Sequence, residues 1–385
     1  MKLLWITERF PPDIGGVAQS SRRIVRSLTA LGISVDVVTW SRYLEPGEIL
    51  PLEPAAGDSE KVRVYRMGLY RHWDMTLPHT LNFLDWLHRQ NQYEVVWGHY
   101  LFPAGFVAVW FARNNDLTSI VSARGNDIDR GMFPPGDFAR LQWTLANASI
   151  VTVVSREMAK KVEVLSQRLV KVLPNVVDGE FFSQGAPDAG GEKALKERLG
   201  IAADEVVLGF SGELREKKGQ RFLLQALSEV RAQRAACLLV IGELRPQSQA
   251  FVQGYAAAHP EDGARVIVTG HLDQPAQVAA HLRLCDVYLQ PSLWEGMPNA
   301  LMEAMACGCV CVGSDAGGIS EVIEHGVSGF VVERSQLHHL GQAVLEYLDL
   351  SSDLKAEISK QASLQIAQHH TLAQEQRLLK TLLSL

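Results

Sequence analysis

Two acidic residues, Glu295 and Glu303, bracket the start of a predicted helix in the second half of the chain. Pro298 opens this helix and Gly308 follows its end, which is the usual placement of proline and glycine. The first backbone N–H groups, around Asn299, have no partner within the helix and, with the helix dipole, favour phosphate. The flanking carboxylates would repel phosphate unless each binds hydroxyl groups instead. The spacing therefore predicts a ligand with phosphate at its centre and hydroxyl groups at both ends, as in a sugar nucleotide.

The segment from Glu295 to Glu303 (EGMPNALME) resembles the E-x7-E signature of the retaining, nucleotide-sugar-dependent glycosyltransferases of family 4. Pro291-Ser292 before it, and Gly317-Gly318 and Gly329-Phe330 after it, also stand as they do in that family. The resemblance implies an α/β protein of the GT-B fold, with two Rossmann-like β/α/β domains facing each other across a central cleft. It also implies that Glu295 holds hydroxyl groups of the donor sugar and Glu303 those of the ribose.

A second phosphate-binding segment is predicted after the strand at 205–210, where a glycine-containing basic loop precedes a helix. Lys218 stands at the lysine position of the family, whereas Glu213 replaces the expected arginine and Arg215 supplies a guanidinium two residues later. Such cations stabilise the charge that builds on a departing diphosphate, by about 3 kcal/mol for one well-placed donor. No metal or other cofactor is therefore expected. The donor that we favour is a UDP-sugar, with a GDP-sugar as the other option.

The first half opens with a strand at 2–7, a Gly15-Gly16 loop, a helix at 17–31 and a strand at 33–40. This is a Rossmann-like unit without a G-x-G-x-x-G fingerprint, so a dinucleotide cofactor is not indicated. The two glycines would let the backbone approach a phosphate or sugar, although a tight turn without a ligand is the plainer interpretation.

His99 ends the strand at 94–99, at the strand end that faces the ligand crevice in open parallel sheets, so it is a candidate catalytic residue as well as a structural one. Arg124-Gly-Asn-Asp127 stands where the family usually has His-Gly-x-Asp. Arginine cannot act as a base, but it binds hydroxyl groups, acidic sugars or phosphate. Asp127 and Asp129 also form D-x-D, a metal motif of another transferase fold, which the two-domain pattern disfavours.

The predicted catalytic residues are Glu295, Lys218, Arg215 and His99. The predicted donor-binding residues are Gly15, Gly16, Arg124, Asp127, Gly212, Leu272, Gly296, Met297, Pro298, Asn299, Ala300 and Glu303; of these, Leu272 occupies a position that borders the nucleobase in the family.

The domain boundary is predicted at the segment 174–178 (PNVVD), which resembles the family's P-N-G-V-D. Residues 1–178, joined by a final helix at 371–385, form the predicted acceptor-side domain, and residues 179–370 form the donor-side domain. Residues 42–60 are expected to be a loop, and residues 183–194 belong to the surroundings of the linker. The run at 61–73 interleaves basic and aromatic residues and is expected to be a strand with one solvated face; a contact with an acceptor or lipid headgroups is the functional alternative.

The composition is that of a globular protein, with 385 residues, 47% of them hydrophobic and 21% charged. The net charge of −6 divides into +3 for residues 1–175 and −9 for the rest, which weakly favours an anionic acceptor or a membrane surface for the first half. Five cysteines, three of them at 307, 309 and 311, predict buried structural thiols; a metal cluster is the alternative. No signal peptide or membrane span is recognised, so a cytoplasmic location is expected, with the inner face of the membrane as an option.

The predicted function is metal-independent transfer of a sugar, with retention, to a glycan, lipid or small-molecule acceptor. Nucleic acid is not an expected partner. A nucleotide-sugar epimerase of the same architecture, or a non-catalytic sugar-nucleotide-binding protein, is the alternative, and the departures at Arg124 and Glu213 motivate the second of these.

Overall fold

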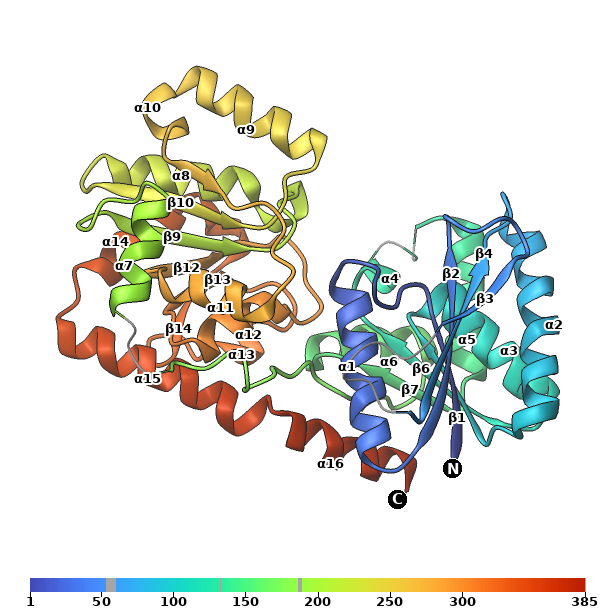
Figure 1. Ribbon diagram of the computed structural model, residues 1–385. Coiled ribbons are helices and arrows are strands. Elements are labelled where there is room, and N and C mark those ends of the chain that lie inside the picture. The colour runs from blue at the N-terminus through green and yellow to red at the C-terminus, as the bar shows by residue number, and fades with distance from the viewer. Residues whose placement is uncertain (53–59, 130, 132, 186–188, 385) are drawn as a thin grey trace. The chain divides into compact units, whose positions relative to one another are not determined.

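The computed structural model describes residues 1–52, 60–129, 131, 133–185 and 189–384 (Figure 1). The chain divides into two compact units. The first contains Met1–Asn175 together with Leu372–Leu385, and the second contains Val176–Thr371. Parts of the predicted loop at 42–60 and of the predicted linker at 183–194 lie outside the described residues.

The first unit is built on an eight-stranded sheet in the order β3-β4-β2-β1-β5-β6-β7-β8. All neighbouring strands are parallel except β3, which pairs antiparallel with β4. The strands are β1 (Lys2–Thr7), β2 (Ser34–Ser41), β3 (Ile49–Leu52), β4 (Val62–Gly68), β5 (Val95–His99), β6 (Thr118–Ala123), β7 (Ile150–Val153) and β8 (Lys171–Val172). The helices are α1 (Gly16–Ala30), α2 (Trp73–Asn91), the π-helical turn η1 (Leu101–Gly105), α3 (Phe106–Asn114), α4 (Asn126–Asp129), α5 (Pro135–Asn147), α6 (Arg156–Ser166) and α16 (Leu372–Leu383).

The second unit has six parallel strands in the order β11-β10-β9-β12-β13-β14. The strands are β9 (Val206–Ser211), β10 (Ala236–Ile241), β11 (Val266–Val268), β12 (Val287–Gln290), β13 (Cys311–Ser314) and β14 (Gly329–Val332). Its helices are α7 (Ala189–Arg198), η2 (Glu216–Lys218), α8 (Gln220–Arg231), α9 (Pro246–Ala258), α10 (Pro260–Gly263), α11 (Pro275–Arg283), α12 (Asn299–Ala306), α13 (Ile319–Val322), η3 (Arg334–His339), α14 (Leu340–Leu348) and α15 (Ser352–His369).

The two sheets share one topology, which decides where ligands bind. In each, the first strand lies in the middle, the next strands add on one side, and the later strands add on the other. The chain reverses its direction of growth between β1 and β5 in the first sheet and between β9 and β12 in the second. Ligands of such doubly wound sheets bind beyond the carboxyl ends of the strands at this switch point. The topology therefore predicts that a ligand-binding site is formed by the loops after β1, β5, β9 and β12.

Apolar side chains cover both faces of each sheet, which explains why these strands read as apolar runs in the sequence. In the first unit one core includes Trp5 and Trp97, and the final helix α16 adds Leu379 to it. A second core, on different residues of the same strands, is closed by α2 and α3. The core of the second unit packs α8 and α14 against the central strands.

Three local features differ from the sequence predictions. The expected loop at 42–60 contains β3, a short edge strand. Its sequence resembles a loop because it contains Pro51 and is flanked by turn residues. Trp73 begins α2 and does not extend the preceding strand. The expected linker at 183–194 contains the start of α7.

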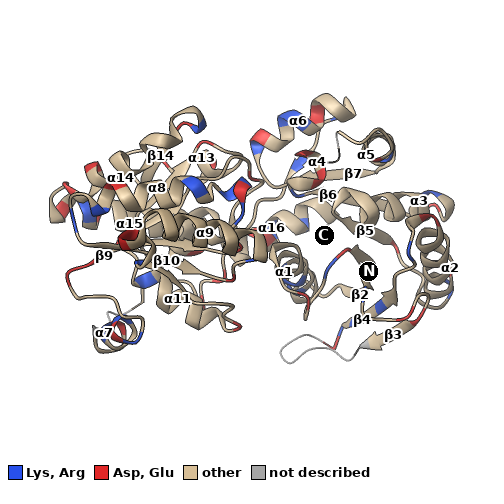
Figure 2. Ribbon diagram, turned by 90° about the horizontal axis from the view of Figure 1, so that it is seen from above, with Lys and Arg blue, Asp and Glu red and all other residues tan. Residues whose placement is uncertain are grey.

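Charge of both signs is spread along the chain. Figure 2 shows basic and acidic residues interspersed on helices such as α6 and α7. Over the described residues, no helix is at once long enough and apolar enough to cross a bilayer.

Candidate active site

The loop after β12 carries Glu295 into a set of polar contacts. Its carboxylate accepts hydrogen bonds from the Ser292 hydroxyl at 3.0 Å and from the Gln290 amide at 3.3 Å. It also forms an ion pair with the Lys218 ammonium. The Glu295 side chain is 8% exposed and that of Lys218 is 23% exposed. Two predicted site residues, 77 positions apart in the sequence, are thus in direct contact.

A glycine places Lys218 against this loop. Gly219 has a φ of +75°, and a Cβ at this position would lie 2.0 Å from the carbonyl oxygen of Pro291. The turn η2 is also tied to the loop by a hydrogen bond from the Leu293 N–H to the Lys217 carbonyl, at 2.8 Å. Only glycine permits both the positive φ and the close approach. The close approach of Gly219 to Pro291 therefore places the Lys218 ammonium next to the Glu295 carboxylate.

A second pair of glycines packs behind Glu295 and fixes the start of α12. A Cβ at Gly317 would lie 2.0 Å from the Glu295 carbonyl oxygen. The Gly318 N–H donates a hydrogen bond of 2.8 Å to the Gly296 carbonyl. Met297 is buried, and Pro298 is the N-cap residue of α12. Gly317 and Gly318 therefore allow the backbone to pack closely behind the loop that carries Glu295.

The start of α12 follows directly on the loop that carries Glu295. Asn299 and Ala300 begin the helix, and the first turn contains no acidic residue. The buried Oδ1 atom of Asn299 has no hydrogen-bond partner among the described residues. Glu303 lies further along the helix and is half-buried. The arrangement agrees with an anion site at the helix start and a separate carboxylate beyond it.

Glu213, the departure from the family pattern, lies between two guanidinium groups. It forms ion pairs with Arg215 and with Arg245. Gly212, with a φ of +111°, turns the chain at the end of β9 just before this group. Arg245 was not predicted as a site residue; its position at the end of the loop that joins β10 to α9 is the signal that could have found it. The three side chains together carry one net positive charge at the carboxyl ends of β9 and β10.

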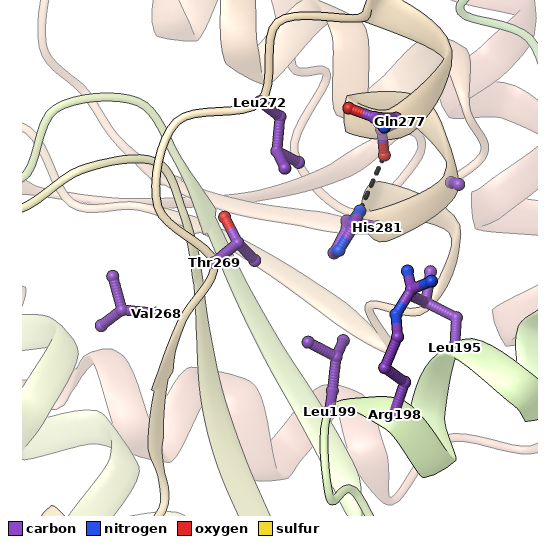
Figure 3. Close-up of a pocket in the computed structure, with 9 residues that line it drawn as sticks. Leu195, Arg198, Leu199, Val268, Thr269, Leu272, Gln277 and His281 are labelled. Atoms are coloured by element: carbon purple, nitrogen blue, oxygen red, sulfur yellow. Dashed lines mark hydrogen bonds between the residues drawn. The ribbon is translucent and has the colours of Figure 1, made fainter.

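Leu272 lines a pocket of about 320 Å³ at the end of β11 (Figure 3). The close-up shows Leu272 and Thr269 on one side and His281 of α11 on the other, with Leu199 and Arg198 from the α7 region below them. The His281 ring is fixed by a hydrogen bond of 2.8 Å between its Nδ1 and the Gln277 carbonyl. Leu272 thus belongs to a mainly apolar pocket of the second unit, separate from the contacts made by Glu295.

His99 is completely buried at the end of β5. Its Nε2 lies 3.0 Å from the Ser20 hydroxyl of α1, and its ring lies against Trp5, with 5.1 Å between ring centroids. Burial, reinforced by the positive charges of Arg124 and Arg23, holds the pKa of His99 well below its usual range. The imidazole is therefore neutral at pH 7 and is enclosed by protein. This environment favours a role in positioning α1 over a direct contact with substrate.

Arg124 and Asp127 shape the loop after β6. The Asp127 carboxylate accepts hydrogen bonds from the backbone N–H groups of Arg124, Gly125 and Leu101, at 2.8–3.2 Å. Burial raises the pKa of Asp127 to about 6, although these N–H groups act in the opposite direction. The Arg124 guanidinium donates to the side-chain oxygen of Asn175. In this structure Asp127 thus holds its own loop and Arg124 reaches the end of the first unit.

Gly15 and Gly16 lie at the start of α1. Gly15 has a φ of +127° and is the N-cap residue, and no side chain caps the helix. The same helix carries Ser20, the partner of His99, so the glycine loop and His99 are linked through α1.

The metal alternatives find no support in the described residues. No group of three or more potential metal ligands occurs there. Asp129, the second acid of the D-x-D motif, forms an ion pair of 3.5 Å with Lys161. All five cysteines are buried and unpaired, and burial raises the pKa of Cys307 to about 12 and those of Cys309 and Cys311 as well. Cys309 lies just before β13, and the expected buried character of the thiols holds.

The predicted residues therefore fall into two sets, one in each unit. Glu295, Lys218 and the start of α12 form the first set, with Arg215 beside Glu213 in the same unit. The second set is centred on His99, Arg124, Asp127 and the glycine loop before α1.

Two family models match the chain. A model described as "Glycosyl transferase 4-like domain" matches residues 15–175, and one described as "Glycosyl transferases group 1" matches residues 205–349. The chain is 24% identical over 369 residues to the putative teichuronic acid biosynthesis glycosyltransferase TuaC of Bacillus subtilis (strain 168), with 90% of this chain and 89% of that protein covered. It is 24% identical over 328 residues to the N-acetyl-alpha-D-glucosaminyl L-malate synthase of Bacillus anthracis, with 84% and 81% covered.

Solved structures share the fold over the whole chain. The sucrose-phosphate synthase of Thermosynechococcus elongatus has a TM-score of 0.82 at 18% identity, covering 100% of this chain and 98% of that one. HepE of Anabaena, solved in complex with UDP and glucose, has a TM-score of 0.79 at 20% identity, with 100% of both chains covered. With family matches in both halves and two doubly wound sheets, the chain belongs to the family 4 glycosyltransferases and has the GT-B fold.

Proposed function

We propose that this glycosyltransferase moves a sugar from a nucleotide diphosphate sugar to a glycan, lipid or small-molecule acceptor, with retention of configuration and without a metal ion. The observation that carries the proposal is the contact between Glu295 and Lys218 at the switch point of the second sheet. An acid and a base held together there offer one group for sugar hydroxyls and one for phosphate.

The ion pair also indicates how the donor is bound. Each partner balances the charge of the other in a partly buried place, where an unpaired charge is costly. A donor would replace this contact, since its diphosphate would satisfy Lys218 and its sugar hydroxyls would satisfy Glu295. The start of α12, with Asn299 and Ala300, would add backbone N–H groups to the same diphosphate. Glu303 would then hold the ribose hydroxyls.

Stabilisation of the leaving diphosphate is the chemical step that these groups support. Negative charge builds on its oxygens in the transition state, so fixed cations nearby lower the barrier. Arg215 and Arg245 are held at the ends of β9 and β10 by Glu213, which explains how the family's arginine position can be acidic without loss of positive charge. We name no protein nucleophile; the leaving phosphate would assist removal of the acceptor proton on the same face. In this scheme His99 positions α1.

A nucleotide-binding screen tests the proposal. We expect UDP to raise the melting temperature in the absence of metal and with EDTA present, and Glu303→Ala to weaken UDP binding measured by calorimetry by about tenfold. GDP is tested in parallel, because the proposal does not specify the nucleobase of the donor. Chiral analysis of the product would check retention once a donor is known. Binding of neither nucleotide, or binding only with a divalent metal, would refute the corresponding part of the proposal.

We also infer that the first unit touches a membrane surface through an aromatic cluster on α3 and α5. Trp110 is 42% exposed and Trp143 is 36% exposed. Their rings pack around Phe106, at 5.5 and 5.2 Å between centroids. Arg140 lies 5.0 Å from the centre of the neighbouring Phe102 ring. Exposed tryptophans beside arginine are typical of surfaces that lie at the boundary of anionic lipids, which would place the enzyme at the inner face of a membrane.

Co-sedimentation with vesicles tests this contact. We expect the protein to sediment with vesicles of phosphatidylglycerol and phosphatidylcholine at low salt, and less so at high salt. Trp110→Ser with Trp143→Ser should reduce the bound fraction several-fold. Phe251→Ser, at an exposed apolar residue of the second unit, is the control and should bind as the wild type does. Equal binding by all variants would exclude the cluster as the contact.

A further inference from the structure

A pocket in the first unit lies at the same sheet edge as the glycine loop and His99, but none of the predicted site residues lines it. Its lining residues are Arg42, Leu69, Tyr70, Arg71 and Trp73. They follow directly on β2 and β4, whose last residues, Ser41 and Gly68, are paired in the sheet. The pocket has a volume of about 360 Å³, which is near the lower end of the range for small-molecule sites, roughly 300–1,000 Å³. It is large enough for about one sugar unit.

Two arginines in this pocket have no hydrogen-bond or ion-pair partner within the described part of the chain. Neither Arg42 nor Arg71 makes a hydrogen bond or ion pair with any described residue, and both are exposed. The two arginines of the preceding strand β4 behave differently, because Arg63 is bound by Asp36 and Arg66 by Asp13. The fold therefore neutralises the arginines of the strand and leaves open the two that line the pocket. Guanidinium groups bind carboxylates and phosphates through paired hydrogen bonds.

Two aromatic rings complete the pocket, and both are held in place. Trp73 makes edge-to-face contacts with Trp40 and Phe102, at 5.4 and 6.0 Å between ring centroids. Tyr70 makes a similar contact with His79, at 5.7 Å. Its backbone N–H also donates to the Thr76 hydroxyl, at 3.1 Å. Rings fixed in this way form an apolar surface at little entropic cost, against which the C–H face of a sugar can pack.

We propose that this pocket binds a sugar unit of the acceptor that carries a negative charge, either the carboxylate of a uronic acid or a phosphate group. The inference rests on the proposed transferase function, because it assigns the pocket to the acceptor. Trp73 and Tyr70 contact the ring of the sugar, and Arg42 and Arg71 bind its anionic group. Asp74, in the first turn of α2, adds a negative charge close by in the sequence. Because this charge offsets that of one arginine, the preference of the pocket for an anion requires both Arg42 and Arg71.

The test measures binding of acceptor probes to the full chain without any donor. The probes are a disaccharide that contains glucuronic acid, glucose 6-phosphate, and neutral maltose as the uncharged reference, each followed by ligand-observed NMR. We expect at least one charged probe to bind about tenfold more tightly than maltose. The Arg42→Gln/Arg71→Gln variant should lose this preference, and Trp73→Ala should weaken binding of all three. The charged probe that responds decides between carboxylate and phosphate.

A matched control removes the same charge elsewhere in the first unit. Arg89→Gln with Arg113→Gln changes two exposed helix arginines, which contact Asp85 and Asn147, and should bind the probes as the wild type does. Nucleotide binding, measured in parallel, should be unchanged in every variant. Equal binding of charged and neutral probes, absence of binding by both charged probes, or an unaltered preference in the double variant would overturn the pocket assignment. If the wild-type protein bound neither UDP nor GDP, that result would instead count against the proposed transferase function.

Discussion

Lys218→Ala is expected to lower the turnover of sugar transfer by about 100-fold, because it removes a cation aimed at the charge that develops on the diphosphate. In the structure this ammonium contacts Glu295, and Gly219 fixes the turn that carries it. The effect should fall mainly on turnover and less on the Michaelis constant of the donor, since the interaction strengthens in the transition state. Steady-state kinetics with the donor identified by the nucleotide screen would measure both quantities.

Lys217→Ala provides the matched control for this prediction. Lys217 lies in the same turn, and its backbone carbonyl accepts a hydrogen bond from the Leu293 N–H, which a side-chain substitution leaves in place. We expect its activity to stay within a few-fold of the wild type. A Glu295→Ala/Lys218→Ala double variant should lose less than the product of the two single losses, because the side chains are in contact. Full activity of Lys218→Ala would remove this lysine from the mechanism.

The second large effect is expected for stability. Glu375→Gln, in the last helix, should lower the free energy of unfolding of the first unit by about 3–5 kcal/mol. Glu375 is completely buried and accepts hydrogen bonds from the Arg23 guanidinium at 2.9 Å and from the Ser27 hydroxyl at 2.7 Å. The substitution keeps the shape but leaves the positive charge of Arg23 without its carboxylate. Urea unfolding followed by tryptophan fluorescence would detect it, since every tryptophan except Trp294 lies in the first unit.

The control for this experiment is Asp85→Asn on α2, in the same unit. The Asp85 side chain is 41% exposed and pairs with Arg89 on the surface, so its removal should cost at most about 0.5 kcal/mol. Replacement of both Arg23 and Glu375 by methionine should recover much of the stability, because neither charge is then left unpaired. A Glu375→Gln variant as stable as the wild type would show that the buried carboxylate contributes little.

Much of the fold could be predicted from the sequence because strands buried on both faces produce apolar runs that end in glycine or proline. The strand at 2–7 and the helix near 17–31 were located in this way within a residue or two. Edge elements were harder. β3 is short, contains Pro51 and pairs only with β4, so its sequence carries turn signals and no alternation.

The contact between Lys218 and Glu295 could be expected in part, since both residues match a family motif. The pairing itself depends on Gly219 approaching Pro291, a long-range contact that no local pattern encodes. Arg245 was missed for the same reason, because its relevance appears only when β9 and β10 lie side by side and Glu213 stands between the two guanidinium groups. His99 was placed correctly at a strand end, but its complete enclosure depends on α1 and Trp5.

The position of α16 has a consequence for biosynthesis. Arg23 leaves the ribosome long before its carboxylate partner, Glu375, which lies 352 positions further along the chain. At about 5–20 residues per second, the intervening second unit takes roughly 10–40 s to synthesise. Throughout that interval the nascent first unit lacks Leu379 in its core and the carboxylate that pairs with Arg23. The first unit therefore reaches its final stability only after α16 has been translated.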